Sequence, residues 1–527
     1  MAKKSEKTKL DLNAEFVAAY NLMESDVPFL FITGRAGTGK STLLSHFRLH
    51  TKKRCAYLAP TGVAALNING ETIHSFFRFT PGISITDARK LALKADKDLY
   101  KKIDALVIDE ISMVRADLLD CVDVFLRRVM NTSEPFGGKQ VIAIGDLYQL
   151  PPVVTSFESD AFAERYETPY FFSSDVVCEL VDAHQIKFIE LEKVYRQSDM
   201  SFVELLNGVR NRSITNEQLS TLNKRVVSNV ASKTKRPEGF IYLTPTNAAA
   251  DEINEINLAT LSTKFIMYRG IVNDNFPEKD LPTDKKLTLA VNARVMFVKN
   301  DPNGQWVNGT LGKVIRVRNL DLDVLIDGED EPITVDAATW TLYRSVYDAE
   351  THGLSQERLG SFVQIPLRLA WATTIHKSQG KSFDRVVVDL GRGAFAAGQV
   401  YVALSRCRTF EGLVLTKPVT KPQLRLDYRV IKFITQIQYA ISQELFSTND
   451  KITQLNDAIR SKSSLNMTYL KAQDEKSRRT ITPMRVYDSE FQGIPFIALD
   501  AYCHLRGADR VFNVERILSL EEIDASL

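Results

Sequence analysis

The sequence has little cysteine: its five residues in 527 are Cys55, Cys121, Cys178, Cys407 and Cys503. They are too far apart to form a CxxC pair or a spacing typical of a metal site. An odd number of scattered cysteines also argues against a disulfide framework. The chain therefore fits a reducing compartment.

Long hydrophobic runs are missing as well. The lysine-rich start at residues 1–10 is not followed by the apolar segment of a signal peptide, and no apolar run has membrane-spanning length. We expect a soluble, cytoplasmic protein of the bacterial type with no membrane partner.

A strong charge of either sign is also absent, because 67 Lys and Arg residues against 65 Asp and Glu residues give a net charge of +2. A polyanion would therefore have to bind in a local basic groove. The remaining composition, 44% hydrophobic and 25% charged, is that of a globular protein and excludes collagen-like and largely disordered chains. The length predicts about three or four domains.

Short apolar runs, each followed by a polar or Gly-rich turn and by helical periodicity, predict an α/β fold with parallel sheets. They fall into two sets, which predict a first domain at residues 12–180 and a second at 181–425. The first set is 29–33, 54–58, 105–108 and 140–144, and the second is 187–191, 240–244, 385–390 and 412–416.

Residues 286–363 have a different pattern, with strand-like runs separated by Asn-Gly and Asp-Gly turns. The runs 293–298, 312–317 and 323–326 predict a small antiparallel β-barrel inserted in the second domain. We expect a helical linker at 426–464 and a separate β-rich module at 465–527.

The segment GRAGTGKS at 34–41 fits the phosphate-binding pattern GxxxxGK[ST] and lies between a predicted strand and a predicted helix. Its glycines let backbone N–H groups surround phosphates, while Lys40 would hold the β- and γ-phosphates and Ser41 would bind Mg²⁺. The predicted nucleotide-binding residues are Gly34, Gly37, Thr38, Gly39, Lys40, Ser41 and Thr42.

Asp109 and Glu110 follow the apolar run 105–108. In a site of this kind Asp109 would bind Mg²⁺ and Glu110 would activate the attacking water. Gln149, in the segment GDLYQLPP at 145–152, could sense the γ-phosphate through hydrogen bonds. Taken alone these segments could be a solvated strand end and a plain loop, but the phosphate loop in the same sheet favours a catalytic role.

Eight segments occur in an order that resembles superfamily 1B helicases and, within them, the Pif family (petite integration frequency) of 5′-to-3′ DNA helicases. They are 34–41, PTGVAAL at 60–66, TIHSF at 72–76, DEIS at 109–112, 145–152, YRQ at 195–197, TIHKSQG at 374–380 and VYVALSR at 400–406. Residues 112–130 and FGG at 136–138 also resemble that family's own signature. The resemblance covers about residues 12–420 and implies two RecA-like P-loop domains, ATP as the nucleotide, and single-stranded and tailed duplex DNA as partners.

The resemblance also implies roles for residues of the second domain. Arg196 and Arg406 would reach the γ-phosphate across a cleft as arginine fingers, which couple closure to chemistry. Gln379 and Gly380 would contact the nucleotide. Without the family pattern, Arg406 could equally be a surface cation and Arg196 a capping or ion-pair residue.

Single-stranded DNA should cross the tops of both domains, where strand–turn segments offer hydroxyls and amides to phosphates. The candidates are Pro60, Thr61 and Gly62 in the first domain and Thr244, Thr246 and Asn247 in the second. By resemblance, His74, Thr374, His376 and Ser378 add contacts.

Aromatic and basic residues extend this prediction. Phe76 or Phe77 could stack on bases, although an aromatic cluster is also typical of a core. Lys313, Arg316 and Arg318 of the barrel could add DNA contacts, and a solvated barrel face explains these charges nearly as well.

The chain departs from the family at one position. Family members commonly carry a Gln near the start that reads adenine, and Phe16 stands at the matching position. Gln offers a donor and an acceptor to adenine, whereas Phe can only stack. We therefore expect weak selectivity for ATP over other nucleoside triphosphates.

The C-terminal module contains the segments RRTITP at 478–483, GIPFIA at 493–498, AYCHLR at 501–506, RVF at 510–512 and ERI at 515–517. Together they resemble a WYL domain, a small β-rich bacterial module associated with ligand or nucleic-acid sensing. Its arginines suit phosphate oxygens, so we expect a nucleic acid or another anionic ligand to bind there. A β-rich docking piece with surface arginines is the alternative. The arginines are Arg478, Arg479, Arg506, Arg510 and Arg516.

Together these features predict an ATP-dependent DNA helicase that moves 5′ to 3′ and unwinds duplex or structured DNA in replication, repair, recombination or telomere maintenance. A RecD-type helicase and a nucleic-acid-binding protein that uses nucleotide only as a switch are the alternatives. The switch is disfavoured because the predicted catalytic residues are all present: Lys40, Asp109, Glu110, Arg196 and Arg406. The physiological DNA and the oligomeric state stay open.

Overall fold

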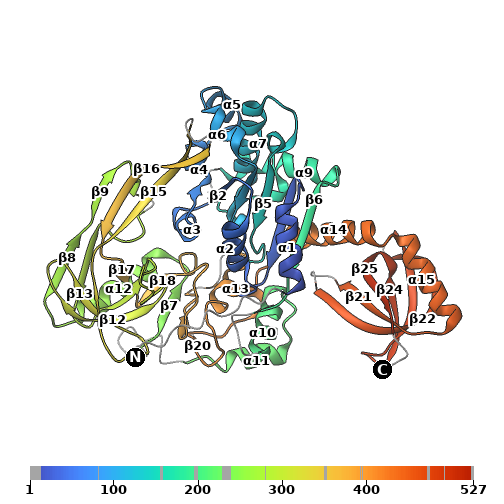
Figure 1. Cartoon of the computed structure of the whole chain (residues 1–527). Helices are drawn as coiled ribbons and strands as arrows, with labels where there is room; N and C mark the ends of the chain where they lie inside the picture. Colours follow the sequence, from blue (N-terminus) through green and yellow to red (C-terminus); the bar gives the residue numbers. More distant parts are fainter. Residues whose placement is uncertain are drawn as a thin grey trace. The chain divides into compact units, whose positions relative to one another are not determined.

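The computed structural model (Figure 1) describes residues 13–80, 82–154, 158–194, 200–227, 239–278, 281–348, 353–391, 393, 396–471, 475–491 and 493–523. The chain divides into two compact units, Met1–Arg210 with Ile214–Arg425 and Asn211–Ser213 with Leu426–Leu527. Among the described residues no helix has the length and apolar character needed to cross a membrane. All five cysteines are free thiols.

The first unit begins with a six-stranded parallel sheet in the order β3-β2-β4-β5-β1-β6. Every residue of β1, β4 and β5 is buried, as expected for central strands of a parallel sheet covered by helices. The strands are β1 Phe29–Gly34, β2 Cys55–Ala59, β3 Glu71–Thr72, β4 Ala105–Ile108, β5 Gln140–Ile144 and β6 Ile186–Leu191. The helices are α1 Ala14–Glu24, α2 Lys40–His50, α3 Gly62–Asn67, α4 Ile73–Phe77, α5 Ile85–Leu93, α6 Lys97–Lys102, α7 Ala116–Met130, α8 Ser159–Ala163 and α9 Asp175–Asp182.

Strand β6 belongs to this first sheet, so the expected domain boundary at residue 180 is wrong. It pairs in parallel with β1 from Phe29↔Ile186 to Gly34↔Leu191. The sequence pattern of β6 is that of any βα strand, and only its pairing partner shows to which sheet it belongs. The first domain therefore extends at least to Leu191.

The second domain has a four-stranded parallel sheet in the order β18-β7-β19-β20. Its strands are β7 Ile241–Thr244, β18 Ala372–Thr374, β19 Val386–Val388 and β20 Leu413–Leu415, and its helices are α10 Met200–Arg210, α11 Asn216–Asn223, α12 Asn247–Ala259 and α13 Gln399–Leu404. Helix α13 is buried at every residue and belongs to the core of this domain, which also includes apolar residues of α10 and β20.

The insert is antiparallel, as predicted, but it is longer than residues 286–363. Its strands run from Phe265 to Leu369, because β8 and β9 pair with β10 and β16 respectively. The strands are β8 Phe265–Arg269, β9 Ile271–Asp274, β10 Lys286–Ala290, β11 Arg294–Phe297, β12 Leu311–Val317, β13 Leu322–Ile326, β14 Ile333–Val335, β15 Ala338–Asp348, β16 Gly353–Gln364 and β17 Leu367–Leu369. The long hairpin β15–β16 contacts α6 of the first domain, and β15 also contacts α4 (Figure 1).

The second unit is a five-stranded antiparallel sheet in the order β24-β23-β22-β21-β25 with two helices. Leu455 and Ala458 of α15 are buried in its core, and α14 contacts β25. The helices expected to form a linker at 426–464 therefore pack on this sheet. The elements are α14 Tyr428–Leu445, α15 Thr448–Ser461, β21 Leu465–Lys471, β22 Glu475–Phe491, β23 Ile494–Cys503, β24 Ala508–Asn513 and β25 Ile517–Glu522.

Candidate active site

The phosphate loop connects β1 to α2. Gly37 has φ 86° and Gly39 has φ 87°, left-handed conformations in which a Cβ atom would be strained. Because Gly39 is the N-cap of α2, the first N–H groups of the helix follow directly on the loop. This backbone is shaped as an anion-binding turn.

The Lys40 ammonium lies over the loop. Its Nζ donates hydrogen bonds to the carbonyl oxygens of Gly34 at 2.7 Å and Arg35 at 3.0 Å. Burial lowers the pKa of Lys40, an effect opposed by the nearby carboxylates of Asp146 and Glu110. A phosphate would therefore meet a desolvated cation at this point.

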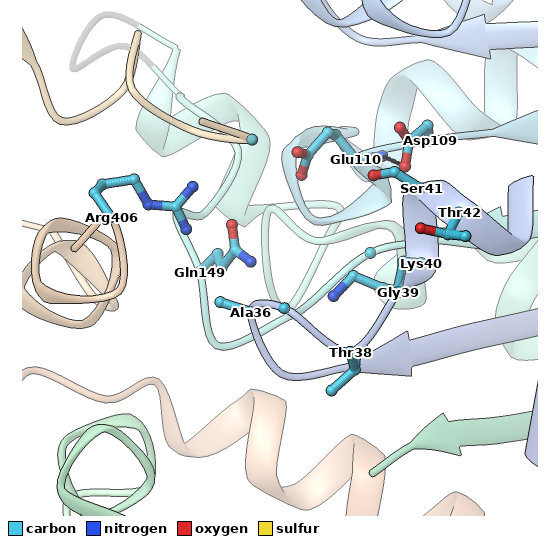
Figure 2. Close-up of a pocket in the computed structure, with 13 residues that line it drawn as sticks. Ala36, Thr38, Gly39, Lys40, Ser41, Thr42, Asp109, Glu110, Gln149 and Arg406 are labelled. Atoms are coloured by element: carbon cyan, nitrogen blue, oxygen red, sulfur yellow. Dashed lines mark hydrogen bonds between the residues drawn. The ribbon is translucent and has the colours of Figure 1, made fainter. Parts of the chain in front are cut away.

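A cavity of about 310 Å³ lies beside the loop. Figure 2 shows Arg406 and Glu110 on opposite sides of it, with Gln149 between them. The lining residues are Ala36, Gly37, Thr38, Gly39, Lys40, Ser41, Thr42, Asp109, Glu110, Gly145, Gln149, Gly380 and Arg406. The structure thus brings most of the predicted nucleotide-binding residues together, from three loops of the first sheet and from the second domain.

Asp109 and Glu110 follow β4 at one side of this cavity. The Asp109 carboxylate accepts a hydrogen bond from the Glu110 amide at 2.9 Å, and Glu110 has a left-handed backbone with φ 51°. Burial, and next the neighbouring Asp109 carboxylate, raise the pKa of Glu110 to about 7. Burial also raises the pKa of Asp109. A pKa near neutrality suits a general base.

The second domain contributes two side chains to the same site. Gln379 Nε2 donates to Glu110 Oε2 at 3.1 Å and to Gln149 Oε1 at 3.2 Å. Arg406 is 1% exposed, and its guanidinium donates to the carbonyl oxygens of Val402 at 2.9 Å and Lys381 at 3.0 Å. Gln379 therefore bridges the predicted base and the predicted phosphate sensor, which the sequence did not indicate. Arg196, with its neighbours in YRQ, lies outside the described residues.

The residues present fit ATP with Mg²⁺. The loop amides and Lys40 suit the phosphates, and Ser41 and Asp109 supply a hydroxyl and a carboxylate to the same cavity. The described residues contain no cluster of three or more His, Cys, Asp or Glu side chains that could hold a metal alone.

Three residues of this region were not singled out from the sequence. Tyr401 of α13 accepts a hydrogen bond from the Ala36 amide at 3.0 Å and donates to Asp146 at 3.3 Å. Asp146 also pairs with Arg210 of α10 at 3.2 Å. Asp146 and Tyr401 lie within two of the quoted motifs, whereas Arg210 has no sequence signal.

The two predicted phosphate cradles for DNA have the same geometry. Thr61 caps α3 and accepts from the Ala64 amide at 3.3 Å, and Thr246 caps α12 and accepts from the Ala249 amide at 3.3 Å. Their backbone angles are φ −127° and ψ 153° for Thr61 and φ −127° and ψ 154° for Thr246. Both threonines are exposed, as is Asn247, while Pro60, Gly62, His74 and His376 are half-buried.

Phe76 and Phe77 do not form a base-stacking platform in this structure. They are 4% and 1% exposed, and their rings contact each other at 4.9 Å and Tyr100 at 5.6 and 5.8 Å. Five aromatic rings from α4, α6, α7 and the segment after α4 pack against one another. Phe76 and Phe77 therefore belong to a core cluster, the alternative given in the sequence analysis. The five are Phe76, Phe77, Phe79, Tyr100 and Phe125.

The hydroxyls of Thr244, Thr374 and Ser378 are also buried and bonded within the protein. Thr244 donates to the Thr246 carbonyl at 3.0 Å, Thr374 accepts from the Lys377 amide at 3.2 Å, and Ser378 donates to the Ile375 carbonyl at 2.7 Å. These hydroxyls therefore stabilise the loops through hydrogen bonds within the protein, and their contact with DNA stays a prediction.

In the insert, a β-bulge between Val314 and Arg316 places Lys313 and Arg316 opposite Leu325 and Asp323, two positions on one face of β13. Arg318 forms an ion pair with Asp323 at 2.6 Å, and Arg316 lies 3.8 Å from the same carboxylate. Much of this basic charge is therefore neutralised within the insert.

Phe16 lies on α1 with 4% of its surface exposed, in the core between α1 and α2. Its ring contacts the imidazole of His46 edge-on at a centroid distance of 5.7 Å. The position expected to read adenine therefore holds a core side chain with no hydrogen-bonding group.

This geometry defines a class of protein: a P-loop nucleoside triphosphatase with two parallel-sheet domains, whose catalytic cavity takes groups from both. Residues 12–220 match the model of the PIF1-like helicase family, and residues 450–522 match that of the WYL domain. The chain is 32% identical over 439 residues to ATP-dependent DNA helicase Pif1 of Bdellovibrio bacteriovorus, covering 82% of this chain and 93% of that protein. It is 35% identical over 442 residues to human ATP-dependent DNA helicase PIF1, covering 80% of this chain and 63% of that protein.

The chain is also similar to solved structures of Pif1 helicases. The crystal structure of Bacteroides sp Pif1 in complex with ADP-AlF4 matches with a TM-score of 0.72 and 35% identity, covering 80% of this chain and 96% of that chain. Bacteroides Pif1 bound to ssDNA matches with a TM-score of 0.56 and 35% identity, covering 80% and 96% of the two chains. The chain belongs to the PIF1-like helicase family: it is a Pif1-type ATP-dependent DNA helicase with a C-terminal WYL domain.

Replacing either of two groups in the cavity should abolish DNA-stimulated ATP hydrolysis. Lys40→Ala removes the phosphate-binding cation, and Glu110→Gln removes the base while keeping the shape of the side chain. We expect both variants to lose at least about 100-fold in kcat, with nucleotide binding retained in Glu110→Gln. Unchanged hydrolysis by Glu110→Gln would show that another group activates the water.

Wild-type kcat/KM for ATP should fall as the pH falls through about 7, because burial and Asp109 raise the Glu110 pKa to about 7 and its protonated form cannot act as a base. A pH profile of initial rates tests this, with circular dichroism at each pH to monitor folding. A flat profile between pH 6 and 8 would contradict the assignment.

The core position of Phe16 predicts weak discrimination between ATP and GTP. We expect kcat/KM values that differ by less than about 100-fold, which corresponds to roughly 2.7 kcal/mol. Steady-state hydrolysis of the two nucleotides measures the ratio. A larger preference for ATP would mean that other residues recognise adenine.

Proposed function

We propose that this helicase translocates 5′ to 3′ on single-stranded DNA and unwinds tailed duplexes as its two parallel-sheet domains open and close around ATP. The observation that supports the coupling of hydrolysis to domain motion is the shared cavity, in which Gln379 and Arg406 of the second domain face Glu110 and Gln149 of the first. A site completed by two domains couples each hydrolysis event to a change in their separation. The 5′-to-3′ direction is proposed from the family resemblance.

In this cycle Ser41 and Asp109 would hold Mg²⁺, which would supply positive charge to the phosphates of ATP. Lys40 moves its hydrogen bonds from the loop carbonyls to the β- and γ-phosphates. Glu110 accepts a proton from the attacking water. Arg406, and Arg196 by family resemblance, stabilise charge on the γ-phosphate, which Gln149 and Gln379 sense. After phosphate release these contacts end and the domains separate.

The DNA path is supported by the paired threonine caps. Thr61 and Thr246 lie at equivalent strand–helix junctions, one in each domain, with matching backbone angles and exposed side chains. Two such cradles that approach and separate would alternately hold and release the DNA backbone. Solved Bacteroides Pif1 structures include complexes with ssDNA. The cellular role we propose is in DNA repair, recombination or telomere maintenance.

Unwinding should require a 5′ single-stranded tail. Strand displacement is measured on matched duplexes with a 5′ tail, a 3′ tail or blunt ends, with and without ATP. Lys40→Ala serves as the control without turnover. Equal or faster displacement from the 3′ tail would exclude 5′-to-3′ movement, and ATP hydrolysis without displacement on any duplex would favour the nucleotide-switched alternative.

We further propose that the C-terminal domain binds DNA or another anionic ligand on the outer face of its sheet. Arg478 and Thr482 on β22 and Tyr502 on β23 alternate onto this face, and His504 follows β23. Tyr502 is 39% exposed and contacts the His504 ring at 5.2 Å, and His504 contacts Thr482 at 2.9 Å. Arg479, by contrast, lies on the core face, 5.7 Å from the Phe512 ring. The five arginines are therefore not one patch.

Arg478→Ala should weaken DNA binding and flatten its salt dependence by about one unit of slope for a lost phosphate contact, while ATP hydrolysis without DNA is unchanged. Fluorescence anisotropy of single-stranded DNA at several salt concentrations measures this. Arg460→Ala is the matched control, because Arg460 is an exposed arginine on α15 of the same unit, with 82% of its side chain accessible. Equal salt slopes for the two variants would contradict a DNA role for this face.

A further inference from the structure

Helix α13 begins directly against the loop that carries Gln149. Its N-cap, Gly398, has φ 70°, and a Cβ at this position would lie 2.4 Å from the carbonyl oxygens of both Tyr148 and Gln149. Backbones of the two parallel-sheet domains are therefore in direct contact here. All six residues of α13 are buried, so the helix cannot move without moving this loop or breaking the contact.

A chain of hydrogen bonds crosses the same interface. The Ala36 amide of the phosphate loop donates to the Tyr401 hydroxyl at 3.0 Å, and that hydroxyl donates to Asp146 Oδ2 at 3.3 Å. Asp146 Oδ1 accepts from Arg210 at 3.2 Å and from the Tyr148 amide at 3.1 Å. The Arg210 guanidinium also lies 4.0 Å from the Tyr148 ring centroid. The phosphate loop is thus tied to α13 and α10 of the second domain.

The hydrogen-bonded side chains Arg210, Asp146 and Tyr401 are buried. The side chains of Arg210 and Asp146 are 2% and 0% exposed, and burial raises the pKa of Tyr401 so that its hydroxyl keeps its proton. A fully buried ion pair is weak support for stability, because apolar residues of similar volume often replace one without loss. Its geometry, however, fixes the relative position of the groups that it joins.

Three members of the chain adjoin groups of the catalytic cavity. Ala36 lines the cavity itself, Asp146 precedes Gln149 in the same loop, and Tyr401 lies on the helix that Arg406 follows. We propose that Tyr401 and Asp146, held by Arg210, are positioning residues for ATP hydrolysis: they set the phosphate loop at the correct distance from Arg406 and Gln149. They act through these two groups and do not contact the reacting atoms.

The test is Tyr401→Phe, which removes the hydroxyl and keeps the ring in the core. We expect kcat for DNA-stimulated hydrolysis to fall about tenfold, with KM for ATP and the melting temperature close to wild type. Tyr166→Phe is the matched control, since Tyr166 also donates to a buried carboxylate, Asp120, at 2.9 Å and lies outside the cavity lining. Its kcat should equal that of wild type.

A double-mutant cycle then tests whether Tyr401 and Asp146 act together. Tyr401→Phe should slow hydrolysis about tenfold in the wild-type background but not further in the Asp146→Asn background, which is non-additive. Tyr166→Phe should leave kcat unchanged in both backgrounds. If Asp146→Asn does not fold because Arg210 loses its partner, the comparison of Tyr401→Phe with Tyr166→Phe decides. The proposal is overturned if these two variants have equal kcat values, or if Tyr401→Phe raises KM alone or lowers kcat only in proportion to a lower melting temperature.

Discussion

The charged groups of the catalytic cavity are half-buried, and the remaining features of the site depend on how their charges are compensated. Lys40, Asp109 and Glu110 line one cavity, where loss of hydration lowers the pKa of the ammonium and raises those of the carboxyl groups. The first domain supplies only partial compensation. Gln379 from the second domain donates to Glu110, and Mg²⁺ and the phosphates of ATP would complete the balance. The Gln379 hydrogen bond from the second domain therefore stabilises the ionised form of Glu110.

Parallel-sheet geometry explains why so few residues are needed to build this site. The carboxyl ends of parallel strands meet at one edge of a sheet, which places the phosphate loop after β1, Asp109 after β4 and Asp146 after β5 beside one another. The same geometry puts Thr61 after β2 and Thr246 after β7. Two parallel sheets thus present equivalent helix caps, and the proposed pair of DNA-binding positions rests on this equivalence.

The motifs could be read from the sequence because each depends on local chemistry. The predicted runs 105–108 and 140–144 coincide with β4 and β5, and glycines with positive φ occur within the phosphate loop. Contacts between residues far apart in the sequence could not be predicted. Phe76 and Phe77 fit a stacking platform and a core equally well until Tyr100 and Phe125 are seen around them, and β6 joins the first sheet only through its pairing with β1. Arg210 gave no signal, because an isolated arginine on a helix is ordinary.

Two links of the interdomain chain, Ala36–Tyr401 and Asp146–Arg210, differ in the cost of breaking them. The bond from Ala36 to Tyr401 is between neutral groups, worth about 1 kcal/mol, and water or a phosphate oxygen can replace it. Separating Asp146 from Arg210 would leave two buried charges unpaired, which costs several times more. Arg210 also ends the first helix of the second domain, close in sequence to the crossing between the domains. The ion pair is therefore the costlier of the two contacts to break, and the hydrogen bond to the tyrosine hydroxyl is the one that a small separation of the domains would break first.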